Sequence, residues 1–129
     1  MSGPFPLIDT SNGTNFSGAW AVCSSMSGPF PLIDTSNGTD FSFAWYFCSS
    51  LTSFPANMFD ACPATNFTDA FVNCALNQTS IDNILVSIAA AGTSGGTLNM
   101  TGGTNATPSA TGLAAKATLA GRGWTVTYN

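Results

Sequence analysis

The chain has 129 residues, of which 44% are apolar and only 6% carry a charge. Six acidic residues against two basic ones give a net charge of −4, and a protein with so few cations is a poor partner for the phosphate backbone of a nucleic acid. Histidine and glutamate are absent and lysine occurs once, which leaves little for acid–base or nucleophilic catalysis. We therefore expect a folded protein that is not an enzyme and needs no cofactor.

Residues 1–9 contain neither a basic segment nor the apolar run of a secretory signal, so we expect synthesis without a signal peptide. No stretch reaches the roughly 18 apolar residues of a membrane-spanning helix, so we expect no membrane insertion. These features predict folding in the cytoplasm, whichever surface the protein reaches afterwards.

The first 50 residues contain one 25-residue unit twice. Residues 1–25 and 26–50 differ only at Asn15/Asp40, Gly18/Phe43, Ala21/Tyr46 and Val22/Phe47. Repetition at this period is typical of a solenoid, in which each unit buries its apolar face against the next. We predict a single solenoid domain over 1–129, made of repeat 1 (1–25), repeat 2 (26–50), a diverged repeat 3 (51–76) and C-terminal capping units (77–129).

Each repeat is predicted to contain one short strand and one short helix. Phe16, Ala19, Trp20 and Cys23 are spaced i, i+3, i+4 and i+7, which is typical of one helical face. The same spacing recurs in repeat 2 at Phe41, Ala44, Trp45 and Cys48, and in repeat 3 at Phe67, Ala70, Phe71 and Cys74. Short apolar stretches at 7–9, 32–34 and 57–60 suit strands, which should pair in parallel from repeat to repeat.

The four cysteines follow the repeats in part. Cys23, Cys48 and Cys74 are equivalent, so we expect them to stack as a ladder, whereas Cys62 lies in an insertion without a counterpart. Stacked strands lie about 4.8 Å apart, which is close enough for a disulfide. Three aligned cysteines cannot all pair, so buried free thiols are the favoured interpretation.

The C-terminal part predicts an alternation of helices and strands. Ile81, Ile84, Leu85 and Ile88 share one helical face, with Ser80 as the expected N-cap and Gly92 as the end of the helix. A strand at 97–101, a helix that starts near Pro108 and ends at Gly121 or Gly123, and a closing strand at 124–128 complete the chain.

Two repeated acidic residues, Asp9 and Asp34, should stack across neighbouring repeats. We expect each carboxylate to cap its own turn, because aspartate commonly bonds backbone two residues further on. The sequence "DTSNG" has its glycine one place early for a calcium loop and lacks the closing glutamate, so no metal site is predicted.

The repeats resemble a known family. The segments "IDTSNGTNFSGAWAVCSS" (8–25) and "IDTSNGTDFSFAWYFCSS" (33–50) resemble the BspA-like branch of the leucine-rich repeat proteins. The C-terminal "SIDNILVSI" and "GRGWTV" are similar to the tail that accompanies such repeats in bacteriophage proteins, particularly those of cyanophages. The resemblance implies a short right-handed α/β solenoid, displayed on a virion or cell surface and used for adhesion or as a structural appendage.

The resulting hypothesis is a non-enzymatic structural or adhesive protein, such as a fibre, spike or capsid decoration of a virion. We expect repeat 1 to expose Phe5, Phe16 and Trp20 as an assembly face for a second copy or another subunit. Tyr46 and Phe47 lie off the predicted core face. They either pack against the insertion of repeat 3 or extend the assembly face.

Two alternatives remain open. The first is a binding module for a surface glycan, a host receptor or ice, using a polar ladder of side chains that recur in repeats 1 and 2. Its members are Thr10, Ser11, Thr14, Thr35, Ser36 and Thr39. The second is a bacterial cell-surface adhesin.

Overall fold

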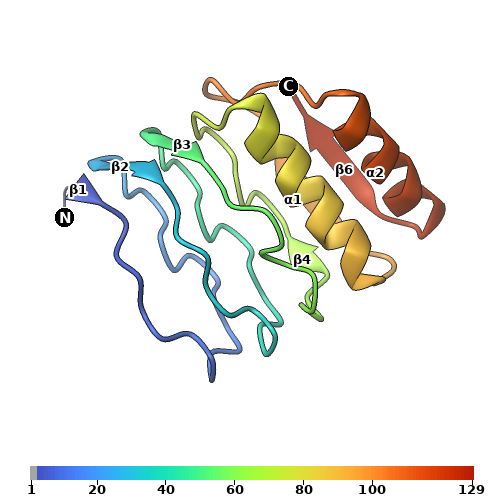
Figure 1. Ribbon diagram of the computed structural model, residues 1–129, viewed down its shortest axis with the longest axis horizontal. Helices are drawn as coiled ribbons and strands as arrows, with labels where there is room; N and C mark the ends of the chain where they lie inside the picture. The colour runs from blue at the N-terminus through green and yellow to red at the C-terminus, as the bar shows by residue number, and fades with distance from the viewer. Residues whose placement is uncertain (1–2) are drawn as a thin grey trace.

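The computed structural model describes residues 3–129 and combines two helices with two small parallel sheets (Figure 1). Their order is β1 (Gly3–Pro4), β2 (Met26–Pro29), β3 (Leu51–Ser53), β4 (Asn66–Phe67), α1 (Gln78–Ala91), β5 (Thr97–Met100), α2 (Ala110–Gly121) and β6 (Thr125–Tyr128). One sheet has the order β1-β2-β3 and the other β4-β5-β6, with every pair parallel. The predicted α/β class and the parallel pairing are confirmed.

The strands of the repeats lie earlier in each unit than predicted. Residues 7–9, 32–34 and 57–60 are not strands, and β1, β2 and β3 precede the Phe-Pro pairs instead. The apolar stretches misled the prediction because Leu7 and Leu32 point outward, with 72% and 55% of their surfaces exposed. Proline has no N–H, so a ladder of backbone hydrogen bonds does not continue regularly through these pairs.

The helices predicted in the repeats do not form. Residues 17–22, 42–47 and 68–73 are instead chains of turns, which we call the turn segments. In repeat 1, the Ala19 N–H bonds the Phe16 carbonyl at 3.1 Å, whereas the Trp20 N–H leaves the segment for the Ala44 carbonyl of repeat 2 at 2.8 Å. An α-helix needs every N–H for its own i−4 carbonyl, so donation to the neighbouring repeat excludes it.

Left-handed residues set the geometry of the turn segments. Positive φ recurs every fourth residue, in one column of equivalent positions at Gly18, Phe43 and Asp69 and in a second column at Val22, Phe47 and Asn73. A turn that closes every four residues returns the chain to the core with nearly the period of a helix. The apolar spacing is therefore close to that of a helix, although the secondary structure at these positions is a chain of turns.

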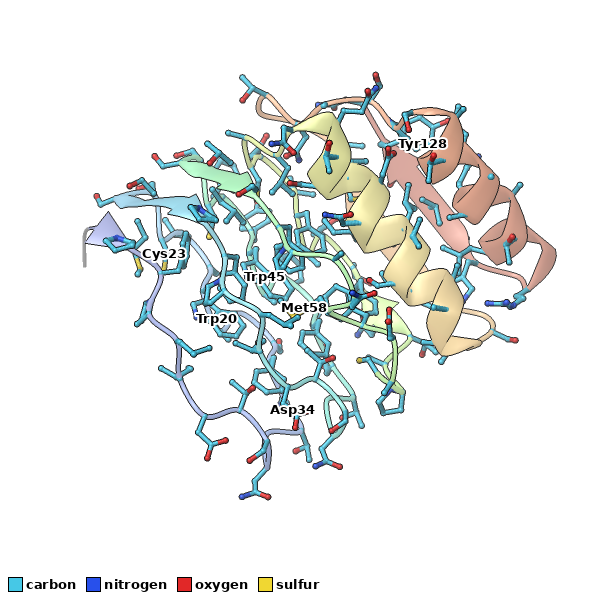
Figure 2. All side chains as sticks on the ribbon, in the orientation of Figure 1. Trp20, Cys23, Asp34, Trp45, Met58 and Tyr128 are labelled. Carbon is cyan, nitrogen blue, oxygen red and sulfur yellow. The ribbon has the colours of Figure 1, made fainter. Side chains whose placement is uncertain are left out.

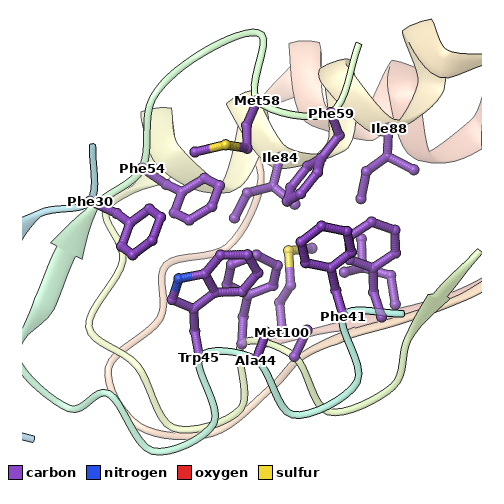
Figure 3. Packing of buried hydrophobic residues seen from close by; sticks show 14 of the residues in the cluster. Phe30, Phe41, Ala44, Trp45, Phe54, Met58, Phe59, Ile84, Ile88 and Met100 are labelled. Carbon is purple, nitrogen blue, oxygen red and sulfur yellow. The ribbon is translucent and has the colours of Figure 1, made fainter. Parts of the chain in front are cut away.

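Aromatic rings from equivalent positions stack to form the core of the repeats (Figure 3). Phe16, Phe41 and Phe67 form one column, with centroids 5.0 and 5.3 Å apart and nearly parallel planes. A second column contains Trp20, Trp45 and Phe71, at 5.3 and 4.8 Å. Phe5, Phe30 and Phe54 form a third, in which Phe5 meets Phe30 edge-on at 5.3 Å and Phe30 stacks on Phe54 at 5.5 Å. Each ring is buried by its counterpart in the next repeat, which is how near-identical units share one core.

The C-terminal part follows its prediction closely. Helix α1 ends at Gly92 with φ 77°, as expected, but its N-cap is Asn77 rather than Ser80. Ser80 lies buried in the first turn, where its hydroxyl accepts the Phe54 N–H at 2.8 Å. Helix α2 is capped by Ser109 and packs beside α1, and β5 and β6 lie within one residue of the predicted bounds. These elements occupy the end of the molecule opposite repeat 1 (Figure 1).

Candidate functional site

The predicted polar ladder has its expected alignment, but most of its hydroxyls bond within the protein. Thr10 and Thr35 are buried, and their hydroxyls donate to the carbonyls of Asp34 and Met58 in the following repeat at 2.7 and 2.6 Å. They hold neighbouring repeats together and are inaccessible to a ligand, which corrects their assignment. The Thr39 hydroxyl likewise donates to the Thr14 carbonyl at 3.0 Å.

Asp9 and Asp34 cap their turns as predicted. One oxygen of each carboxylate accepts two bonds from the serine two residues later, from the hydroxyl of Ser11 or Ser36 at 2.7 or 2.6 Å and from its backbone N–H. The serine hydroxyls, and next the N–H groups, lower the pKa of both carboxyls. Ser11 and Ser36 are thereby committed to local turns (Asp34 lies near the lower rim in Figure 2).

The predicted assembly face is wrong for three of its five residues. Phe5, Phe16 and Trp20 are buried, with 6%, 8% and 8% of their surfaces exposed. Figure 2 shows Trp20 beside Trp45 inside the stack. Phe16 and Trp20 lie flat on Phe41 and Trp45, and Phe5 meets Phe30 edge-on, so a face of repeat 1 does not expose these rings.

Repeat 1 nevertheless exposes other groups than the three predicted rings. Ala44 is fully buried, whereas its counterpart Ala19 is exposed, and Cys48 is buried whereas Cys23 is half-buried. The carbonyls of Asp40, Ser42, Ala44 and Tyr46 accept N–H groups of repeat 1 at 2.7–2.9 Å. The equivalent carbonyls of Asn15, Ser17, Ala19 and Ala21 accept no hydrogen bond from any residue within 3–129. We call this row, with Ala19 at its centre, the repeat 1 end; the side-chain pattern gave no sign of it, because it consists of backbone.

Tyr46 and Phe47 lie on the outer side of the turn segments, as predicted from their positions. Together with Phe43 they form an aromatic cluster, with Tyr46 5.3 Å from Phe43 and 4.5 Å from Phe47 between ring centroids. Phe43 and Phe47 expose 41% and 40% of their surfaces. The sequence analysis did not select Phe43, although it is one of the four positions at which repeats 1 and 2 differ.

A second outward-facing row runs the length of the molecule and was also missed. Parallel pairing aligns Asn15, Asp40, Asn66, Thr97 and Thr125. In the repeats these side chains fold back on the chain: the Ser42 N–H and hydroxyl both donate to Asp40 Oδ1, at 2.9 and 2.7 Å. The row is visible only when the distant β5 and β6 are placed in register with the repeats.

The structure has four free cysteines, in line with the favoured interpretation. Burial raises the pKa of the Cys48 thiol to about 12 and that of the Cys74 thiol to about 12. The Cys48 thiol donates to the Trp20 carbonyl and the Cys74 thiol to the Trp45 carbonyl. These thiols are structural groups, because a nucleophilic or metal-binding cysteine needs a lowered pKa.

Three other features are absent from residues 3–129: a metal centre, a pocket and a membrane-spanning helix. That part of the chain contains no group of three potential metal ligands and no detected pocket. Within the same residues, neither helix has the length and apolar character needed to cross a membrane. Comparison with protein-family models, with curated proteins and with solved structures finds no match for this chain.

Proposed function

We propose that this chain is a structural building block, a short leucine-rich-repeat-like solenoid that acts by assembling with other protein chains through the repeat 1 end. The observation that carries the proposal is the row of four carbonyls at Asn15, Ser17, Ala19 and Ala21, which accept no hydrogen bond within residues 3–129, whereas their counterparts in repeat 2 are all bonded. Unpaired backbone groups at the edge of a stack provide a template for pairing with another chain.

The near identity of repeats 1 and 2 indicates which kind of partner fits the repeat 1 end. Repeat 2 offers repeat 1 the same carbonyl spacing and nearly the same side chains that repeat 1 offers a partner. A partner segment with N–H groups at every second position, as in the turn segments themselves, matches the row. Assembly also supports the setting that the family resemblance suggests, a component of a virion surface built from many copies.

Light scattering across a concentration series tests the proposal. We expect the average mass of the purified chain to rise with concentration. The variant Ala19→Lys places a charge at the centre of the repeat 1 end and should stay monomeric, while Ala117→Lys, at an exposed position of α2, should assemble normally. A chain that stays monomeric at every concentration, or an Ala19→Lys variant that assembles like the parent, contradicts the proposal.

A further inference from the structure

All four differences between the duplicated repeats fall on or beside the outer side of the turn segments. At the other 21 of 25 positions the two repeats are identical, including every ring of their shared core. Three of the differences, Gly18/Phe43, Ala21/Tyr46 and Val22/Phe47, convert small side chains into the aromatic cluster. The substitutions are therefore confined to a surface, although the core must tolerate the same packing in both repeats.

The substitutions create a step between neighbouring repeats. Phe43 and Tyr46 of repeat 2 are large, whereas the equivalent residues next to them, Gly18 and Ala21, are the smallest available. A Cβ placed on Gly18 would meet no atom within 4 Å, so the space beside Phe43 is open. We call this arrangement the aromatic step: the side chains of Phe43, Tyr46 and Phe47 in repeat 2, next to the small side chains of repeat 1.

A polar acceptor lies close in the chain to the aromatic step. Asp40 precedes Phe43 by three residues. One of its carboxylate oxygens accepts the Ser42 N–H and hydroxyl at 2.9 and 2.7 Å. The other oxygen has no hydrogen-bond partner within residues 3–129 and can accept a hydroxyl. Asp69 and Asn73, the counterparts of Phe43 and Phe47 in repeat 3, lie on the side of the cluster away from repeat 1.

The backbone beneath the cluster is strained. Phe43 and Phe47 have φ of 57° and 58°, in the left-handed region that costs a residue with a Cβ roughly 1 kcal/mol or more. Gly18 and Asn73 show that glycine or asparagine serves at these positions with less strain. The positive φ itself belongs to the turn segments of every repeat, because Val22, Asp69 and Asn73 share it. Repeat 2 differs in carrying bulky rings there, with two-fifths of their surfaces exposed.

Size and charge together indicate the occupant. About 40% of a ring-bearing side chain of roughly 200 Å² leaves near 80 Å² exposed on each phenylalanine, so the two together offer roughly 160 Å², far below the ~800 Å² per partner of a stable protein interface. The carboxylates of Asp40 and Asp69 disfavour an anion, and the two basic residues lie at 116 and 122, within or next to α2. An uncharged ring with C–H groups on one face and hydroxyls around its rim fits both the exposed aromatic side chains and the acceptor oxygen of Asp40.

We propose that the aromatic step binds neutral carbohydrate, with a sugar ring against Phe43, Tyr46 and Phe47 and a hydroxyl donating to Asp40. This site is distinct from the repeat 1 end and does not depend on assembly. It places carbohydrate recognition on the turn segments rather than on the threonine ladder, whose central hydroxyls are buried.

Titration with cellohexaose, laminarihexaose and maltohexaose, followed by amide chemical shifts in two-dimensional NMR, tests the proposal. We expect saturable shifts, confined to residues 18, 21, 22 and 40–47, for at least one of the three. The variant Phe43→Gly/Tyr46→Ala/Phe47→Val gives repeat 2 the side chains that repeat 1 already carries at these positions, so its fold should persist while its affinity falls at least tenfold. A second variant, Phe47→Asn, copies the residue of repeat 3 and should weaken binding without strain.

The control variant Leu7→Ser/Leu32→Ser removes two apolar side chains that are more exposed than those of the aromatic step. It should bind like the parent. Absence of shifts with all three saccharides, or equal binding by the parent and the triple variant, overturns the proposal. A triple variant that abolishes self-assembly, with no saccharide bound by the parent, would also overturn it and identify a second copy as the occupant. The Ala19→Lys variant separates the two sites, because it should lose assembly and keep saccharide binding.

Discussion

The two halves of the molecule bury their apolar residues by different means. Residues 3–76 contain no helix, and their core consists of aromatic columns in which each ring lies on its counterpart from the neighbouring repeat. Residues 77–129 contain two capped helices, and α1 contributes the aliphatic side chains Ile81, Ile84, Leu85 and Ile88. The change of element accompanies the loss of sequence repetition.

Near-identical repeats can pack only in an arrangement that suits identical side chains. When consecutive units carry the same residue at each position, every side chain packs against a copy of itself, and flat rings stack well at the spacing of paired backbones. A helix is wider than this spacing, so near-identical units as close as repeats 1 and 2 have no room for one. Once the sequence diverges, α1 and α2 pack beside each other with unlike side chains.

Replacing Trp45 should test the aromatic half most severely. Trp45 is fully buried and packs against rings from all three repeats, so Trp45→Ala should lower the free energy of unfolding by about 3–5 kcal/mol. Its indole N–H has no acceptor within residues 3–129, so Trp45→Phe should cost much less. Urea denaturation followed by circular dichroism measures both. A loss under about 1 kcal/mol for Trp45→Ala would show that the columns do not stabilise the fold.

Asn105 provides the equivalent test where the two halves meet. This buried side chain accepts the Leu76 N–H at 3.0 Å and donates to the carbonyls of Phe71 and Met100 at 2.8 and 3.1 Å. Asn105→Ala leaves these groups without partners and should cost about 2–3 kcal/mol. Asn105→Asp keeps the acceptor but loses both donors, and should also destabilise. Thermal unfolding of Asn105→Asp at the parent's midpoint would refute this role.

The buried thiols predict a pH dependence that comes from the repeats. Burial raises the pKa of Cys48 and of Cys74 to about 12, whereas an unfolded thiol has a pKa of about 8.5. The unfolded chain therefore loses these protons first. The resulting stability is complete below about pH 8.5 and declines as the pH rises toward about 12. In urea denaturation between about pH 8 and about pH 10.5, the stability of Cys48→Ala/Cys74→Ala should fall less than that of the parent. Equal slopes would mean that these thiols do not contribute.

The smallest expected effect is that of a glycine substitution on the free energy of unfolding, which should have opposite signs in the two halves. Val22 has φ 59°, which a β-branched residue adopts only under strain, so Val22→Gly should raise the free energy of unfolding by about 0.5–1 kcal/mol. Val86 is an exposed residue of α1, and Val86→Gly should lower it by a similar amount because glycine weakens a helix interior. Chemical denaturation of both variants measures the difference. Destabilisation by Val22→Gly would show that its side chain makes contacts that outweigh the strain.

Sequence alone predicted the second half better than the first. Around α1 and α2, the cap residues and the apolar period are local signals, and the two helices and β5 and β6 were found close to their actual bounds. In repeats 2 and 3 the buried positions were correct, because Phe41, Trp45, Phe67 and Phe71 are in the core. Their secondary structure was not, because it depends on backbone bonds to the neighbouring repeat, which leave no local signature.

The candidate sites show the same limit. The burial of Phe5, Phe16 and Trp20 and the internal bonds of Thr10 and Thr35 follow from how the repeats stack, which no single repeat reveals. Tyr46 and Phe47 could be placed outside the core because they fall between the periodic positions. Asp9 and Asp34 could be assigned to turns because their partners lie two residues away.

The turn segments also make the stack electrically polar. Four N–H groups of repeat 1 donate to repeat 2 and four of repeat 2 donate to repeat 3, all in the same direction. Peptide dipoles aligned in this way add, as they do along a helix, and the carbonyl end carries the negative pole. Two repeat 1 ends placed face to face would oppose like poles and leave eight carbonyls without donors. If the proposed assembly takes place through this end, it should be head-to-tail, and the expected product is a directional filament or a closed ring rather than a two-fold symmetric dimer.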